Sequence, residues 1–228
     1  MPFYIIVIII SFIASIIGLS LKENRNAPLT YFPFFLLLTA VVEYYGLKWS
    51  LRNLNTNLLY NLFTLVEFLF YFNFFKCLFQ NPAIKKTISM VMVIFFILTI
   101  INIIFFQGKF YIKGKGFSIA GMEFHTYTYM LGSLLVVIFS ILYFNLLFRF
   151  PETGRLTRNP YFWIVTGVMF FEICTFTVYG LNNFIAQTMR QYDRVLTLVS
   201  DFLNVLLYTS FTIGFLCRIK IRKLSWLS

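Results

Sequence analysis

The chain alternates long apolar runs with short polar breaks. Seven runs are each long enough to cross a membrane, which takes roughly 20 apolar residues in a helix that rises about 1.5 Å per residue. The breaks carry charged residues, Pro or Gly. The runs are continuous and lack the alternation of a transmembrane β-barrel, so the pattern predicts helices. The seven expected spans are 3–21, 28–46, 58–79, 88–107, 127–148, 161–182 and 195–217.

Composition supports the same class. Of the 228 residues, 60% are hydrophobic and 12% are charged, and the mean hydropathy is +0.81. An average soluble domain is about 45–50% apolar and about 25% charged. These values exclude a soluble globular domain and a disordered chain. We therefore expect an all-α polytopic membrane protein with a single transmembrane domain over residues 1–228.

The Lys and Arg residues predict an orientation, because short cytoplasmic loops are enriched in positive charge. Seven of the 19 fall on the side that holds the N-terminus, and twelve fall on the other side, which includes the tail 218–228. We expect the N-terminus outside and the C-terminus in the cytoplasm, in a bacterial inner membrane. The net charge of +11 is expected to meet anionic lipids at the cytoplasmic face and no nucleic acid.

A short internal similarity predicts a repeat. In each half of the chain, a helix that begins near a proline and contains an acid is followed by a helix in which an acid precedes Phe-Leu. The residues are Pro33, Glu43 and Glu67-Phe68-Leu69 in the first half, and Pro160, Glu172 and Asp201-Phe202-Leu203 in the second. The first three helices would then correspond to the last three in a parallel repeat, with the fourth as a lipid-facing connector. The two prolines fit either helix starts or hinges.

This three-plus-one-plus-three layout with an outer N-terminus resembles the SWEET-type sugar carriers and the vitamin-precursor carriers of bacteria. More distantly, it resembles the rhodopsin-like seven-helix bundle. The resemblance covers the architecture of the whole chain and involves no family-specific motif. The last span, 195–217, contains no Lys that could hold retinal as a Schiff base, so a retinal pigment is not expected.

Four carboxylates lie inside the predicted spans: Glu43, Glu67, Glu172 and Asp201. An ionisable side chain near the bilayer centre costs about 2.5–3.5 kcal/mol on insertion scales. No Lys or Arg is expected at the same depth. The acids must therefore either be protonated or bind something positive, such as a cation, a proton in transit or an amine-bearing ligand.

Helical spacing places other polar groups on the same faces as these acids. Tyr71 shares a face with Glu67, and Asn204 and Tyr208 continue the face of Asp201. Stripes that meet in the interior would line a polar cavity. The expected substrate-binding residues are Glu43, Glu67, Tyr71, Glu172, Asp201, Asn204 and Tyr208. The alternative is that the stripes only join helices through hydrogen bonds, at roughly 0.6 kcal/mol each.

The segment 108–126 contains two short alternating runs around a Gly-Lys-Gly turn, a pattern that fits either an ordered outer loop or a two-stranded hairpin on the outer face. Beside it we expect His125 to be an ordinary surface histidine. One His cannot form a three-histidine zinc site, and no metal or cofactor is expected. The chain also lacks the sequence motifs of known catalytic sites, so no enzyme activity is expected.

These observations favour a protein that binds or transports a small cationic or proton-coupled solute through an acid-lined central cavity. The alternative is a seven-helix sensor or receptor-like subunit that signals through a separate partner protein. An intramembrane enzyme ranks below both, and it would gain support only from two of the carboxyls lying within hydrogen-bonding distance beside a lipid-accessible cleft. Expected partners are the lipid bilayer, a small-molecule or ion ligand, and either a cytoplasmic partner protein or further copies of this chain.

Overall fold

A computed structural model describes residues 3–20, 27–103, 124–149, 156–185 and 193–217. Within these ranges the chain is helical and contains no strand, as the sequence predicts. Seven of the helices are long and apolar enough to cross a membrane. They are α1 (Phe3–Ser20), α3 (Phe32–Ser50), α4 (Asn57–Leu78), α5 (Pro82–Ile101), α6 (Thr126–Arg149), α7 (Pro160–Ile185) and α8 (Asp193–Leu216). A short helix, α2 (Ala27–Thr30), and a 3₁₀ turn, η4 (Leu156–Arg158), lie between them.

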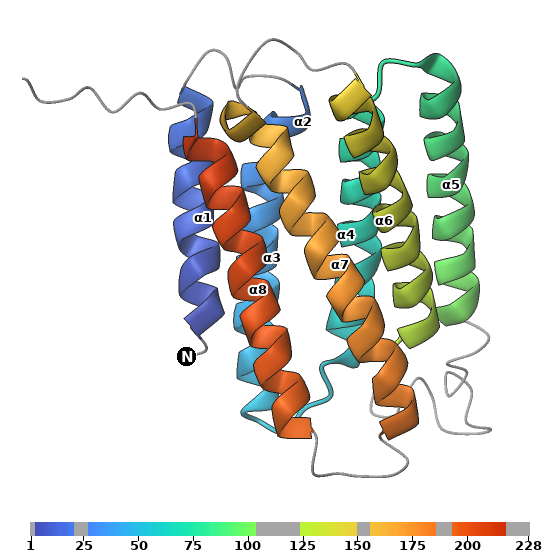
Figure 1. Ribbon diagram of the computed structural model, residues 1–228. Helices are drawn as coiled ribbons and strands as arrows, with labels where there is room; N and C mark the ends of the chain where they lie inside the picture. The colour runs from blue at the N-terminus through green and yellow to red at the C-terminus, as the bar shows by residue number, and fades with distance from the viewer. Residues whose placement is uncertain (1–2, 21–26, 104–123, 150–155, 186–192, 218–228) are drawn as a thin grey trace, which may run out of the picture.

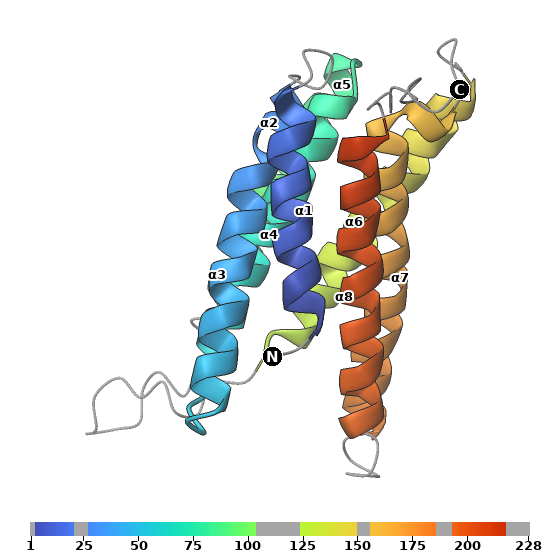
Figure 2. The same ribbon diagram turned by 90° about the vertical axis from the view of Figure 1, so that its left-hand side faces the viewer.

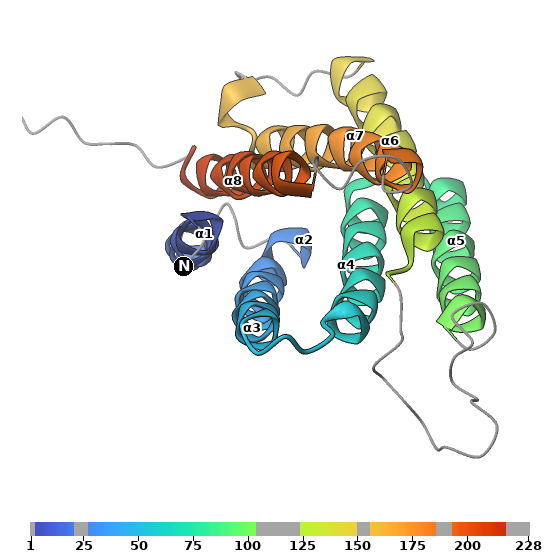
Figure 3. The ribbon, with the colours of Figure 1, turned by 90° about the horizontal axis from the view of Figure 1, so that it is seen from below.

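The long helices lie side by side and alternate in direction (Figure 1). We call the end of the bundle that carries Phe3 and Ser50 the N end, and the end that carries Ser20 and Leu78 the C end. Six helices form a ring in chain order, α1, α3, α4, α6, α7 and α8, and α8 closes the ring against α1. Figure 2 shows α1 between α3 and α8. Seen along the bundle, α5 stands outside the ring beside α4 and α6 (Figure 3).

The starts of the helices follow from local chemistry. α3 has Pro33 in its first turn and α7 begins at Pro160, where the missing proline N–H leaves no hydrogen bond unmade. Both prolines are therefore helix starts. α5 begins at Pro82, six residues before the predicted start at Ile88. The reason is the side chain of Asn81, which accepts a 2.8 Å hydrogen bond from the backbone N–H of Ala83 and caps the helix.

Two of the segments singled out in the sequence fall wholly or mostly outside the described residues. Of the segment 108–126, only residues 124–126 are described. The basic tail 218–228 lies entirely outside the described residues.

Phenylalanine side chains fill the ring interior in the half nearer the C end. The ring of Phe32 packs edge-on against Phe74 and Phe211, each with centroids 5.3 Å apart, a favourable geometry for aromatic pairs. Phe139 lies 5.8 Å from Phe72 and 6.1 Å from Phe75 by the same measure. We call this set, in which no side chain is more than 5% exposed, the phenylalanine layer: Phe32, Phe72, Phe74, Phe75, Phe139, Phe211 and Phe215.

Candidate functional site

Two of the predicted acids form a buried pair inside the ring. Glu67 comes from the middle of α4 and Glu172 from the middle of α7. They lie close enough for their charges to interact. Glu67 is 8% exposed and Glu172 is completely buried. Glu67 lies ten residues inside α4, so the pair sits near the centre of the expected membrane span.

The pair has few hydrogen-bond partners. The Tyr71 hydroxyl donates to Oε1 of Glu67 at 3.4 Å, a long contact. Neither carboxyl oxygen of Glu172 has a hydrogen-bond partner among the described residues. The hydroxyl of Ser133 on α6 lies beside this carboxyl, but it does not reach hydrogen-bond geometry and is itself unpartnered. A buried polar group left in this state costs about 1–3 kcal/mol, more if it is charged.

The third acid, Glu43 of α3, is better provided with partners. The hydroxyl of Tyr4 donates to its Oε2 at 2.7 Å and that of Tyr60 at 3.4 Å. Gly46, one turn further along α3, makes room for this arrangement. A Cβ atom at Gly46 would collide with the Tyr60 hydroxyl. Glu43 is half-buried and is held by tyrosines from two neighbouring helices.

The four acids are connected electrostatically. The half-buried Asp201 of α8 interacts with Glu43 and with Tyr4, and Glu43 interacts with Glu67. The acids thus form a series from Asp201 and Glu43, nearer the N end, to the buried pair. Within the described part of the chain, none of the four has a Lys or Arg as an interaction partner.

Buried tyrosines surround the acids. Tyr71 and Tyr208 are buried and both interact with Glu67. Toward the N end, the rings of Tyr129 and Tyr179 lie 4.6 Å apart, and Phe124 stacks on Tyr179 at 5.2 Å. Tyr129 and Tyr179 both interact with Glu67 and Glu172, so this aromatic group adjoins the buried pair on the side of the N end.

Six of the seven residues predicted for the site therefore interact with one another, whereas the one hydrogen bond of Asn204, which lies one turn from Asp201, does not reach the acids. Its amide donates to the backbone carbonyl of Ser200 in its own helix at 2.9 Å, so that hydrogen bond stays within α8. Sequence reasoning missed Tyr4, Tyr129 and Ser133. Ser133 follows Gly132, whose missing side chain lets α6 approach the ring of Phe68, and this adjacent pair of small residues was the available signal.

The prediction for His125 was wrong. Its side chain is only 2% exposed, because His125 packs at the junction of two other helices and makes polar contacts with both. The backbone N–H of His125 donates to Oδ1 of Asn61 at 3.0 Å, and its Nδ1 lies 3.1 Å from Oδ1 of Asn102. Burial lowers the pKa of His125 to about 4. The histidine joins α4, α5 and the start of α6 at the N end.

A pocket of about 690 Å³ opens at the C end, between the ends of α4 and α6 and the starts of α5 and α7. Its polar lining comes from amides and hydroxyls, including Gln80, Tyr143 and Asn159. Tyr143 lies one turn beyond Phe139, so the phenylalanine layer separates this pocket from the buried acids.

No group of three or more His, Cys, Asp or Glu residues in the described part of the chain is arranged to hold a metal ion. Comparison of the chain with protein-family models, with curated proteins and with solved structures finds no match.

Proposed function

We propose that this chain is a multi-pass membrane carrier for a small cation or a proton-coupled solute, with its N end outside and its C end in the cytoplasm. The observation that carries the proposal is the enclosure of Glu67 and Glu172 together without a basic side chain. Two neighbouring carboxylates in a low-dielectric interior repel each other and lose hydration. A proton or a small cation at the pair provides the missing positive charge.

The position of the pair supports a carrier over an open channel. From the N end, the half-buried Glu43 and Asp201 offer a first site for a cation. From the C end, the pocket of about 690 Å³ approaches the pair but stops at the phenylalanine layer. A cation that crosses must pass from the acids to the pocket through a rearrangement of this layer. A central site that is closed toward both ends, and that opens to one side at a time when these rings rearrange, is the behaviour of a carrier.

The helix arrangement supports the internal repeat. Around the ring, α1, α3 and α4 are followed by α6, α7 and α8, and α5 stands outside. The two groups of three helices therefore occupy opposite halves of the ring and run in the same directions. Each half contributes one member of the buried pair, Glu67 from the first and Glu172 from the second. A two-fold carrier with a central site between its halves has this arrangement.

Reconstitution into vesicles tests the proposal. Protein in liposomes loaded with a pH-sensitive dye should carry protons inward when a potassium gradient and valinomycin impose a potential, and methylammonium serves as a second probe. We expect Glu67→Gln and Glu172→Gln to reduce both fluxes to the level of empty liposomes. Glu152→Gln, the same chemical change at a position between the predicted spans 127–148 and 161–182, should leave them unchanged. Equal fluxes in all variants would contradict the proposal.

A sensor that signals through a separate protein is the second candidate. The observation that favours it is the C-end pocket, whose volume falls in the range of small-ligand sites and whose polar lining would face a cytoplasmic partner. Absence of flux in the wild-type protein, together with co-purification of a stoichiometric soluble partner, would support this candidate over the carrier.

A further inference from the structure

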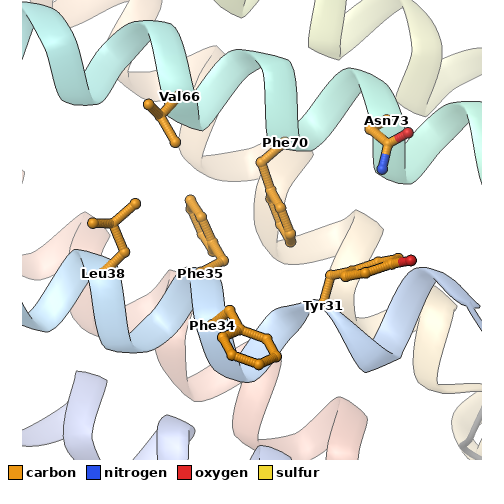
Figure 4. A pocket seen from close by; sticks show the side chains of 7 residues that line it. All are labelled: Tyr31, Phe34, Phe35, Leu38, Val66, Phe70 and Asn73. Atoms are coloured by element: carbon orange, nitrogen blue, oxygen red, sulfur yellow. The ribbon is translucent and has the colours of Figure 1, made fainter.

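A groove of about 310 Å³ runs along the outside of the ring between α3 and α4. Figure 4 shows that its two ends differ. Tyr31 and Asn73 lie at one end, and Leu38 and Val66 lie at the other. Tyr31 directly precedes α3, and Asn73 lies five residues before the end of α4, so the polar end of the groove is the one nearer the C end.

The floor of the groove is aromatic and closed. The rings of Phe35 and Phe70 stack with centroids 4.1 Å apart and planes 3° apart. Behind them Phe32 packs against Phe70 at 5.0 Å and belongs to the phenylalanine layer. The groove therefore ends on the packed interior and opens only outward, away from the acids.

Asn73 is the unusual residue in this position. Its side chain is exposed on the outer surface of the ring, and its amide has no hydrogen bond to any described residue. Among hydrocarbon chains an amide without partners is expensive, by several kcal/mol. The polar ester and headgroup region of a lipid can supply the partner that the described residues do not. One turn further toward the C end stands Lys76, in the last turn of α4, where a positive charge faces the phosphate groups of a bilayer.

We propose that this groove binds an anionic phospholipid of the cytoplasmic leaflet. One acyl chain lies along Leu38 and Val66, the Tyr31 hydroxyl and the Asn73 amide bind the ester region, and Lys76 binds the phosphate. The groove changes from polar to apolar in the direction in which a phospholipid does. The proposal rests on the membrane location proposed above and not on the transport of a cation.

A second copy of the chain fits the groove less well. In a two-fold dimer centred here, each concave surface would face the other, and the space between the copies would stay unfilled. The charge of Lys76 would also meet that of its counterpart. A lipid fills the groove, gives Asn73 a hydrogen-bond partner and neutralises the lysine.

Native mass spectrometry of the full chain in detergent tests the proposal. The probes are phosphatidylglycerol and phosphatidylcholine with identical acyl chains, and inorganic phosphate as a headgroup without a lipid. We expect preferential retention of phosphatidylglycerol that inorganic phosphate does not displace. Asn73→Leu and Lys76→Gln should each weaken retention about five- to tenfold, the range of one net hydrogen bond or ion contact.

A pair of tryptophan variants separates the groove from the general lipid surface. Val66→Trp fills the groove and should abolish the preference, whereas Val93→Trp, on the exposed face of α5, should keep it. Equal retention in these two variants would overturn the proposal. So would equal retention of the two lipids, or a dimer that Asn73→Leu dissolves while lipid retention is unchanged. Glu67→Gln should retain the lipid, so failure of the carrier proposal and failure of this one are distinguishable.

Discussion

The interior of the ring has two halves of opposite chemistry. Toward the N end it holds four acids and several tyrosines, and two of those acids lack adequate partners. Toward the C end it holds the phenylalanine layer, whose rings contact one another at ordinary aromatic distances. Both halves are closely packed, so packing alone does not explain the acids. The phenylalanine layer offers no polar side-chain atom to a cation, so in the proposed carrier it acts as the barrier, and the carboxyls without hydrogen-bond partners act as the ligand site.

The acid half itself contains a second contrast. Glu43 receives hydrogen bonds from Tyr4 and Tyr60, whereas Glu172 receives none from the described residues. A carboxyl with two hydroxyl donors can stabilise the contacts of α3 with its neighbours. A buried carboxyl without donors destabilises the fold unless something binds it, which is the pattern expected of a binding site.

The largest effect is expected in the barrier. Phe139→Ala removes a ring that is 5% exposed and should destabilise the protein by about 2–4 kcal/mol. In a membrane the lost packing contacts still lower stability, although the hydrophobic transfer from water no longer contributes. The substitution should also let protons leak through the layer. Thermal unfolding in detergent and dye-loaded liposomes measure the two effects. Phe170→Ala, a ring that is 49% exposed, is the matched control and should change neither.

The next effect tests the acid pair. Glu172→Met replaces an unsatisfied carboxyl with an apolar side chain of similar length, and should stabilise the unliganded protein by about 1–3 kcal/mol. The same replacement at Glu43 should destabilise it, because two tyrosine hydroxyls lose their acceptor. The unfolding temperature should therefore rise in Glu172→Met and fall in Glu43→Met. A loss of stability in both would show that Glu172 has a structural partner.

A pH dependence is expected at the N end. The pKa of His125 is lowered from 6.5 to about 4 by burial, so between these values the unfolded chain binds more protons than the folded one. The stability from the neutral histidine is complete above pH 6.5 and is lost as the pH falls toward 4, by about 1–2 kcal/mol. Unfolding at a series of pH values should show this slope, and His125→Gln should flatten it. If the dependence of stability on pH is unchanged in His125→Gln, other groups must cause it.

The smallest effect is expected from one hydroxyl. Tyr4→Phe removes the 2.7 Å hydrogen bond to Glu43 and should reduce stability by about 0.5–1.5 kcal/mol. Tyr44→Phe, on the exposed face of α3, is the control. If both variants unfold at the wild-type temperature, the contrast between Glu43 and Glu172 loses its basis.

Much of the fold follows from apolar run length, because a span needs a minimum length of helix and little else. The boundaries were less predictable where polar residues belong to a helix. The start of α5 was placed at Ile88 because Lys85 and Lys86 look like a break, whereas the Asn81 cap places them inside the helix.

The site was predictable only in part. Period-3.6 spacing tells which residues share a face of one helix, and it placed Tyr71 beside Glu67 correctly. It does not tell which helices face each other, so the pairing of Glu67 with Glu172 could not be derived. His125 was misjudged because its burial depends on Asn61 and Asn102, two distant amides that no local pattern connects to it.

The claim on which the carrier proposal depends is that Glu67 and Glu172 together hold an exchangeable positive charge. Infrared difference spectra of the reconstituted protein, recorded between alkaline and acidic buffer, report carboxyl groups that change protonation. We predict a carboxyl C=O band that disappears in the double variant Glu67→Gln/Glu172→Gln and persists in Glu43→Gln/Asp201→Asn. An unchanged band in the first double variant would contradict the claim.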